Sequence, residues 1–236
     1  MRLIAWNILQ GAGNRSRSVA DELLRYNADL ITLTEFRLPA AQAVIDSLAE
    51  RGYRHRLVGD PVQAGNRIAL FSRLPFLVYE APFSTPAFRN RWMEVALPTV
   101  DVTVATVYGP MGEVKKTFWT SLLRAADERR HRRFVLLGDL NTGDSRCDRE
   151  GAPFNCSEEF VELGYVLRDA WRHVNGNKRD FSWFSWKRGK TGKNGFRIDH
   201  AFVSQPLLSH VRGCRYEHGA RERQLSDHSI LILELD

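Results

Sequence analysis

The sequence predicts an α/β fold in a single domain. Short apolar runs of strand length alternate with longer amphipathic segments of helix length, and Pro or Gly separates many of them. No repeat, low-complexity tract or linker divides the 236 residues, and layered α/β folds of this length often form one domain. The hydrophobic share of 43% is enough for a large core. We therefore expect one α/β domain that spans residues 1–236.

Two strand–helix pairs are expected in the N-terminal segment. Ser18 and Asp21 have the spacing of a capping box, which marks the start of the first helix. Gly52 follows the second helix, at a position where glycine commonly ends helices. The expected elements are a strand over residues 2–6, a helix over 18–27, a strand over 30–34 and a helix over 40–51.

The middle of the chain has the pattern of an antiparallel meander. Its apolar runs are short, and Pro and Gly residues separate them. The runs lie near residues 67–71, 76–81, 92–97 and 102–108.

The C-terminal half mixes helices with strands. An apolar run from Phe134 is a strand, and after Asn141 the chain is irregular to about Asn155, a length that favours a functional loop. The other expected elements are helices over 113–130 and 157–163 and strands over 181–186, 197–203, 211–216 and 230–235.

The charge balance favours a polyanionic partner. Lys and Arg total 34 against 28 Asp and Glu, so the formal charge is +6, and nucleic acid or another phosphate ligand fits this balance. Three cysteines without CxxC spacing argue against a disulfide framework and a zinc cluster. The chain shows no signal-peptide pattern and no apolar stretch of roughly 18 residues. We expect a cytoplasmic monomer that does not bind membranes.

Polar side chains follow several of the predicted strands. The run from Phe134 ends in Asp139 and Asn141, which the twofold period of a strand places on one face. Taken singly, each such residue has an ordinary explanation, such as an Asx turn formed by Asp139 and Asn141. Together they suggest one pocket lined by oxygen atoms. Asn7, Glu35 and Asp199 also follow apolar runs, and Asp227 and His228 come just before the last one.

These strand-end residues favour a hard cation. They supply oxygen donors and one histidine but no thiolate, a set that suits Mg²⁺ or Mn²⁺ better than zinc. His228 alone would more often be a structural hydrogen-bonding residue. Beside Asp199, however, its imidazolium form would be favoured and could contact a phosphate.

The motifs carry a family resemblance. Trp6-Asn7, Thr34-Glu35, Tyr108-Gly109-Pro110, Gly138-Asp139-Leu140-Asn141, Arg197-Ile198-Asp199-His200 and Ser226-Asp227-His228 occur in the order typical of the endonuclease/exonuclease/phosphatase superfamily. The chain most resembles the branch of exonuclease III and the abasic endonucleases. The resemblance implies a DNase I-like four-layer α/β sandwich, in which two face-to-face sheets are flanked by helices.

The resemblance also implies a role for each position. Glu35 matches the principal metal ligand, and Asn7 and Asp227 complete or border the metal site. Asp139 matches the residue that orients or deprotonates the attacking water, and Asn141 helps to hold that water and the phosphate. The remaining implied catalytic positions are His228, which contacts the phosphate, Asp199, which orients His228, and Tyr108, which lies near the scissile phosphate.

A basic segment with interleaved aromatic residues suggests how substrate is bound. Cations for a phosphate backbone lie beside rings that could stack on bases, although the rings could also be core and the basic loop merely solvated. In the abasic-endonuclease branch, positions like Trp183 and the run from Phe196 to Asp199 help to form the lesion pocket. The expected substrate-binding residues are Trp183, Lys187, Arg188, Lys190, Lys193, Phe196, Arg197 and Ile198.

The leading hypothesis is a Mg²⁺- or Mn²⁺-dependent phosphodiesterase that cleaves nucleic acid by in-line attack of water. DNA is the expected substrate, cut by an endonuclease or 3′ exonuclease, with abasic-site repair as one form of this activity. A second hypothesis keeps the chemistry but replaces nucleic acid with a small phosphate ester, such as an inositol phosphate, a lipid headgroup or a nucleotide. A third is a non-catalytic nucleic-acid-binding module on the same scaffold.

Overall fold

Two six-stranded sheets form the centre of the molecule. The computed structural model describes residues 1–59, 65–186 and 193–236. Sheet A contains, in spatial order, β13 (Val211–Glu217), β14 (Ile230–Leu235), β1 (Arg2–Asn7), β2 (Leu30–Phe36), β4 (Arg67–Ser72) and β3 (His55–Val58). Sheet B contains β5 (Leu77–Tyr79), β6 (Trp92–Leu97), β7 (Val102–Tyr108), β8 (Phe134–Asp139), β12 (Asp199–Val203) and β9 (Arg168–Asp169).

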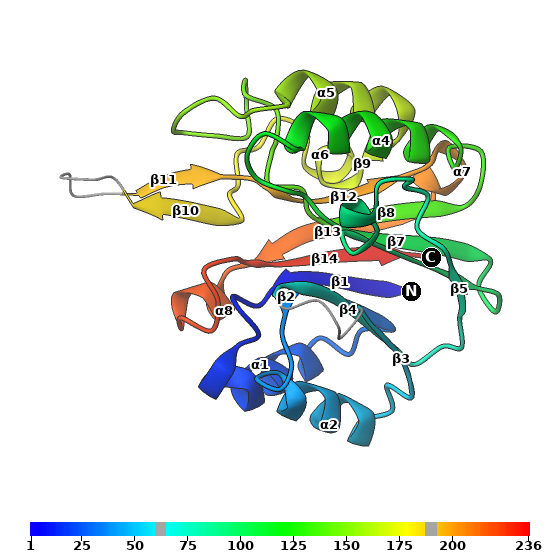
Figure 1. The fold of residues 1–236 in the computed structure, drawn as a ribbon, viewed down its shortest axis with the longest axis vertical. Helices are drawn as coiled ribbons and strands as arrows, with labels where there is room; N and C mark the ends of the chain where they lie inside the picture. The colour runs from blue at the N-terminus through cyan, green and yellow to red at the C-terminus, as the bar shows by residue number, and fades with distance from the viewer. Residues whose placement is uncertain (60–64, 187–192) are drawn as a thin grey trace.

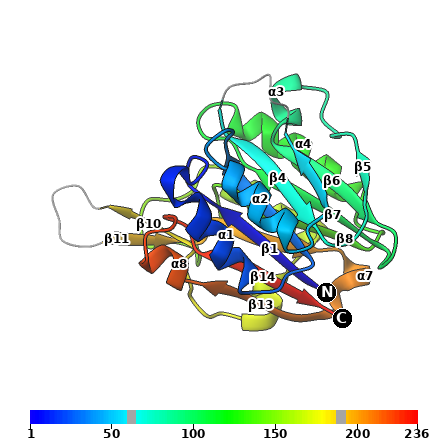
Figure 2. The same ribbon diagram turned by 90° about the horizontal axis from the view of Figure 1, so that it is seen from below.

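Helices cover the outer faces of both sheets (Figure 1). Helices α1 (Ser16–Leu24) and α2 (Gln42–Glu50) pack on sheet A, and α4 (Lys115–Asp127) and α5 (Ser157–Val166) pack on sheet B. Figure 2 shows α1 and α2 lying across the strands of sheet A, with the two chain termini close together. The shorter helices are η1 (Gly13–Arg15), α3 (Pro86–Arg89), α6 (Ala170–Asn175), α7 (Gln205–Leu208) and α8 (Gly219–Glu222). The expected four-layer α/β sandwich is therefore confirmed.

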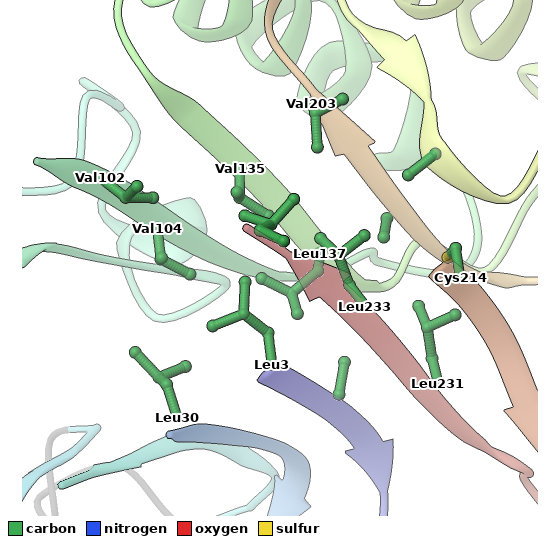
Figure 3. Packing of buried hydrophobic residues seen from close by; sticks show 14 of the residues in the cluster. Leu3, Leu30, Val102, Val104, Val135, Leu137, Val203, Cys214, Leu231 and Leu233 are labelled. Carbon is green, nitrogen blue, oxygen red and sulfur yellow. The ribbon is translucent and has the colours of Figure 1, made fainter. Parts of the chain in front are cut away.

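The core between the sheets is aliphatic. Alternate residues of each strand point into the space between the two sheets, because successive side chains of a strand face opposite sides. Leu3 and Leu233 from sheet A lie opposite Val135 and Leu137 from sheet B, all almost fully buried (Figure 3). This layer holds the two sheets in a fixed relation to each other.

The expected meander is wrong at its first strand. β4 pairs with β2 and β3 in sheet A, whereas β5, β6 and β7 form an antiparallel set in sheet B. The chain thus changes sheets between β4 and β5. Apolar runs of similar length predict buried strands, but they do not specify which strand each one pairs with.

Two smaller expectations also fail. α1 begins at Ser16 with Arg15 as its N-cap residue, so Ser18 lies inside the helix and does not cap it. The strand expected at 197–203 begins two residues later, as β12 at Asp199, because the hairpin of β10 (Trp183–Trp186) and β11 (Lys193–Phe196) precedes it and residues 197–198 connect the two. This hairpin projects from the body of the sandwich (Figure 1).

Arg197 is buried in an ion-pair network and does not meet the expectation that it binds substrate. Its side chain is 1% exposed. Its guanidinium donates to both carboxylate oxygens of Asp148, at 2.8 and 2.9 Å, and to Asp169 at 2.6 Å. Arg172 also pairs with Asp148. Arg197 therefore ties the irregular segment after β8 to β9 and to the residues that precede β12.

Asp148 stays charged inside this network. Burial by itself raises the pKa of Asp148, but the charge and hydrogen bonds of Arg197, with further help from Arg172, outweigh burial and hold the pKa well below its ordinary value of 3.8.

We predict that Asp148→Asn lowers the free energy of unfolding at neutral pH by about 3–5 kcal/mol, because it leaves Arg197 buried without its main partner. The folded-state pKa of Asp148 lies below the unfolded value, so its contribution is complete above about pH 4 and is lost as the pH falls further. Urea unfolding of both proteins across this range should therefore show a difference that shrinks on acidification. Equal stability at neutral pH would contradict the prediction.

Along residues 1–59, 65–186 and 193–236, no helix has the length and apolar character needed to cross a membrane.

Candidate active site

The polar strand-end residues meet at one edge of the sandwich. In sheet B, parallel pairing of β7 with β8 sets Tyr108 beside Asp139, and antiparallel pairing of β8 with β12 sets Asp139 beside Asp199. These three residues form a row across sheet B. In sheet A, Asn7 ends β1 and is paired in register with Thr34, the residue before Glu35. Each sheet thus brings its polar residues to the same edge.

Three side-chain contacts cross from one sheet to the other at this edge. Asn7 Nδ2 donates to Asp139 Oδ2 at 3.0 Å. The Tyr108 hydroxyl donates to Glu35 Oε1 at 3.1 Å. His228, which precedes β14 of sheet A, lies with Nδ1 2.8 Å from Asp199 Oδ2, so the expected contact between these two residues is present.

The loop that carries His228 is anchored to β1. The indole N–H of Trp6 donates to the His228 carbonyl at 3.0 Å, and the Ser226 hydroxyl donates to the Asn7 carbonyl at 2.6 Å. These bonds place the imidazole ring beside Asp199.

Asp139 and His228 are buried ionisable groups whose charges depend on each other. Burial and the neighbouring Asp199 carboxylate raise the pKa of Asp139, although the charge of His228 and the hydrogen bond from Asn7 oppose the rise. Burial lowers the pKa of His228, but the charge of Asp199 and its hydrogen bond outweigh burial and raise it. The site therefore combines a carboxylate of raised proton affinity with an imidazole that is favoured as imidazolium.

Asn141 reaches the site through a turn and not through the strand. β8 ends at Asp139, and Asn141 has a left-handed backbone with φ 52°. Its N–H donates to Asp139 Oδ1 at 2.9 Å, which is an Asx turn, and its amide donates to the Gly109 carbonyl at 2.9 Å. The expected twofold strand period thus does not extend to Asn141. The turn itself orients Asp139, since it occupies one carboxylate oxygen.

Glycine is required at the two positions beside this turn. Gly138 has φ 138°, and a Cβ there would overlap the Val107 carbonyl. A Cβ on Gly109 would collide with the backbone of Leu140. Close approach of the backbones of β7 and β8 therefore holds the turn in place.

A bulge in β2 aims Glu35 into the site. The register between β2 and β4 shifts between Leu33 and Phe36, and Glu35 has φ 54°. The backbone N–H of Gln10 donates to Glu35 Oε2 at 2.9 Å. A bulge that reorients a side chain is common beside active sites, and its left-handed residue carries a conformational cost.

A cavity of about 410 Å³ opens at this edge. Asp227 lies exposed beside it, and its Oδ2 accepts a hydrogen bond from the Trp183 indole at 2.9 Å. The cavity is lined by both polar and apolar side chains. The predicted site residues among them are the polar Glu35, Asp139, Asn141, Asp227 and His228 and the largely apolar Trp183, Phe196 and Ile198.

Of the remaining predicted substrate-binding residues, Arg197 is the one whose side chain is described, and it does not line this cavity. Lys187, Arg188 and Lys190 lie outside the described residues, and Lys193 is the first residue of β11. Arg197 is in the buried ion-pair network.

The donor set fits a hard divalent cation. Asp139, Asp199 and His228 each carry one potential ligand atom, and these atoms lie within 4.8 Å of one another among the described residues. Asn7 links Glu35 to this group, because its Nδ2 donates both to Asp139 Oδ2 and to Glu35 Oε1, the latter at 3.2 Å. The carboxylate oxygens of this group suit Mg²⁺ or Mn²⁺, while His228, favoured as imidazolium, borders the site and offers no lone pair to the metal.

Lys115 is a lining residue that the sequence reasoning missed. It is the first residue of α4, is 5% exposed and lines the cavity. The sequence could have indicated that Lys115 is buried, because it lies at helical spacing from Phe118, Trp119 and Leu122, which form the buried face of α4.

We predict that Asp199→Asn lowers the pKa of His228 by about 1–3, because it removes the carboxylate charge that favours imidazolium. An NMR titration of the His228 ring in metal-free protein measures this change. An unaltered pKa would mean that Asp199 does not govern the charge of His228.

Comparisons with known proteins agree with the fold and site. The family model described as Endonuclease/Exonuclease/phosphatase family matches residues 4–228. An AP endonuclease from Archaeoglobus fulgidus is 18% identical, with a TM-score of 0.84, and covers 100% of this chain and 99% of its own. The 3′ phosphatase NExo from Neisseria, solved with product DNA hairpin, is 22% identical, with a TM-score of 0.80 and coverage of 100% and 99%.

A 3′–5′ exonuclease, NExo from Neisseria meningitidis, is also 22% identical, with a TM-score of 0.80 and full coverage of both chains. At these identities the likeness concerns the fold. No curated protein matches the sequence significantly. The family match over almost the whole chain shows that this protein belongs to the endonuclease/exonuclease/phosphatase family, whose members cleave phosphate esters.

Proposed function

We propose that this protein is a Mg²⁺- or Mn²⁺-dependent phosphodiesterase that hydrolyses nucleic acid, with DNA as its main substrate, as an endonuclease or 3′ exonuclease. The observation that carries the proposal is the buried Asp139 carboxylate, which is held by Asn7 and Asn141 beside the Asp199–His228 pair in an open cavity.

Asp139 is suited to accept the proton of the attacking water. Its raised pKa brings its proton affinity closer to neutral pH, where a general base is most effective. Both of its oxygens are oriented, one by Asn7 and one by the Asn141 N–H. The Asn141 amide, fixed by Gly109, would help to hold the water and the phosphate.

His228 is suited to bind the phosphate. Since Nδ1 faces Asp199, Nε2 is the atom that points to a ligand, and as imidazolium it donates a charge-assisted hydrogen bond to a phosphate oxygen. Such a donor stabilises the charge that grows on the phosphate during in-line attack. Tyr108, joined to Glu35, would lie beside the same phosphate.

Glu35 is the proposed principal metal ligand, with Asn7 and Asp227 completing or bordering the metal site. A divalent cation bound there would polarise the phosphate and stabilise the departing oxygen.

The apolar lining of the cavity supports a nucleotide-containing substrate over a bare phosphate ester. Trp183, Phe196 and Ile198 offer faces on which a base or a sugar can pack. The centroids of the Trp183 and Phe196 rings lie 5.8 Å apart, with the ring planes tilted by 46°. The net charge of +6 favours a polyanion, and the similar folds named above include proteins described as acting on DNA.

We predict that Asp139→Ala lowers the rate of nucleic-acid cleavage by about 10²–10⁴, because it removes the general base. The assay compares labelled abasic duplex, blunt duplex, single-stranded DNA and RNA, each with Mg²⁺ and with EDTA. Asp101→Asn is the control, since its side chain is 92% exposed, and it should retain full activity.

EDTA should abolish cleavage, and added Mg²⁺ or Mn²⁺ should restore it. Cleavage that persists in EDTA, or that Asp139→Ala leaves intact, would overturn the proposed mechanism. Hydrolysis of small soluble phosphate esters alone would overturn the nucleic-acid substrate while leaving the chemistry in place.

A further inference from the structure

Lys115 lies between two cavities. It lines the active cavity of about 410 Å³ and also a larger neighbouring cavity of about 880 Å³ beside the N-terminus of α5. Phe154 and Asn155 line both cavities as well. Lys115 thus occupies the wall that separates the site of Asp139 from the adjoining hollow.

Among the residues that the structure describes, the ammonium group of Lys115 makes one hydrogen bond, to the backbone carbonyl of Asn141 at 2.6 Å. An ammonium carries three donors, so the bond leaves donors available. Within residues 1–59, 65–186 and 193–236, none of the salt bridges includes Lys115. Within the described residues this cation, which is 5% exposed, therefore has no carboxylate in ion-pair contact.

This placement is costly for folding. Lys115 begins α4, where the partial positive charge of the helix N-terminus repels a cation. The first turn of α4 contains no acidic residue, and Val114 at the N-cap offers no side-chain cap. Burial lowers the pKa of Lys115, and the nearby Cys156 and Asp139 oppose this only in part. A neutral residue of similar length would suit the fold better.

We propose that Lys115 binds a non-bridging oxygen of the substrate phosphate in the active cavity, through donors that its bond to the Asn141 carbonyl leaves available. This inference rests on the proposed function, because a phosphate ester supplies the anion that Lys115 lacks. Lys115 and His228 line the same cavity, so two cations would contact the phosphate, one from α4 and one from the loop before β14.

A purely structural role predicts different behaviour. If Lys115 only tied α4 to Asn141, its loss would lower stability and leave phosphate affinity unchanged. If it binds phosphate, Lys115→Met should weaken phosphate binding and keep or raise thermal stability, because an unpaired buried cation is removed.

The test measures binding of inorganic phosphate by calorimetry in the presence of EDTA, so it needs neither metal nor turnover. Lys115→Met should weaken binding by about tenfold or more, the cost of losing a hydrogen bond to a charged group. Lys116→Met is the matched control, because Lys116 is the next residue of α4 and is exposed, and it should bind within about twofold of wild type.

Lys115→Gln keeps a donor without the charge, and it should fold and also bind phosphate weakly if Lys115→Met is unstable. For binding to single-stranded DNA in EDTA, Lys115→Met should reduce the slope of log affinity against log salt by about 0.7, the value for one lost phosphate contact. Equal phosphate affinity in wild type and both Lys115 variants, or no phosphate binding by wild type, would overturn the inference. Either result is independent of whether the protein cleaves nucleic acid, which tests the proposed function separately.

Discussion

Asp139 is buried at the line where the two sheets meet, and the rest of the site follows from the need to stabilise that carboxylate. A buried carboxylate requires hydrogen bonds or neighbouring positive charge, and the turn that follows β8 supplies one hydrogen bond, from the Asn141 N–H. Asn7 reaches it from sheet A, and His228 adds its charge from the loop before β14. Because both partners come from the opposite sheet, the site exists only when the aliphatic core sets the two sheets in their observed relation.

The edge of the sandwich that holds the site also carries local strain and unfavourable charge. Glu35 and Asn141 both have left-handed backbones, with φ 54° and 52°. Lys115 is buried without an ion pair in the described structure, and Gly138 and Gly109 permit backbone approaches that no other residue would allow. Each feature costs stability, so the well-packed core between the sheets must offset them. Their concentration at one edge is what we expect where function selects the residues.

The sequence predicted most of the site because its residues lie at the ends of apolar runs of clear strand character. Asn7 and Asp139 end their strands, whereas Asp199 begins β12 and His228 precedes β14, so each lies where a strand meets a loop. The pairing of strands was harder to predict. β4 was assigned to the wrong neighbouring strands because an apolar run does not indicate which strand it will pair with. Arg197 matched a motif for substrate binding, but its buried partner Asp148 lies 49 residues away and could not be foreseen. Lys115 was overlooked because a charged residue at a helix start is usually solvated.

A double-mutant cycle between Asn7 and Asp139 tests most directly whether the two sheets act as one catalytic unit. The measurement is kcat/KM for the proposed nucleic-acid hydrolysis by wild type, Asn7→Ala, Asp139→Ala and the double variant. If Asn7 acts by holding Asp139, the double variant should be about as slow as Asp139→Ala alone. Losses that multiply, as expected for independent residues, would contradict this account.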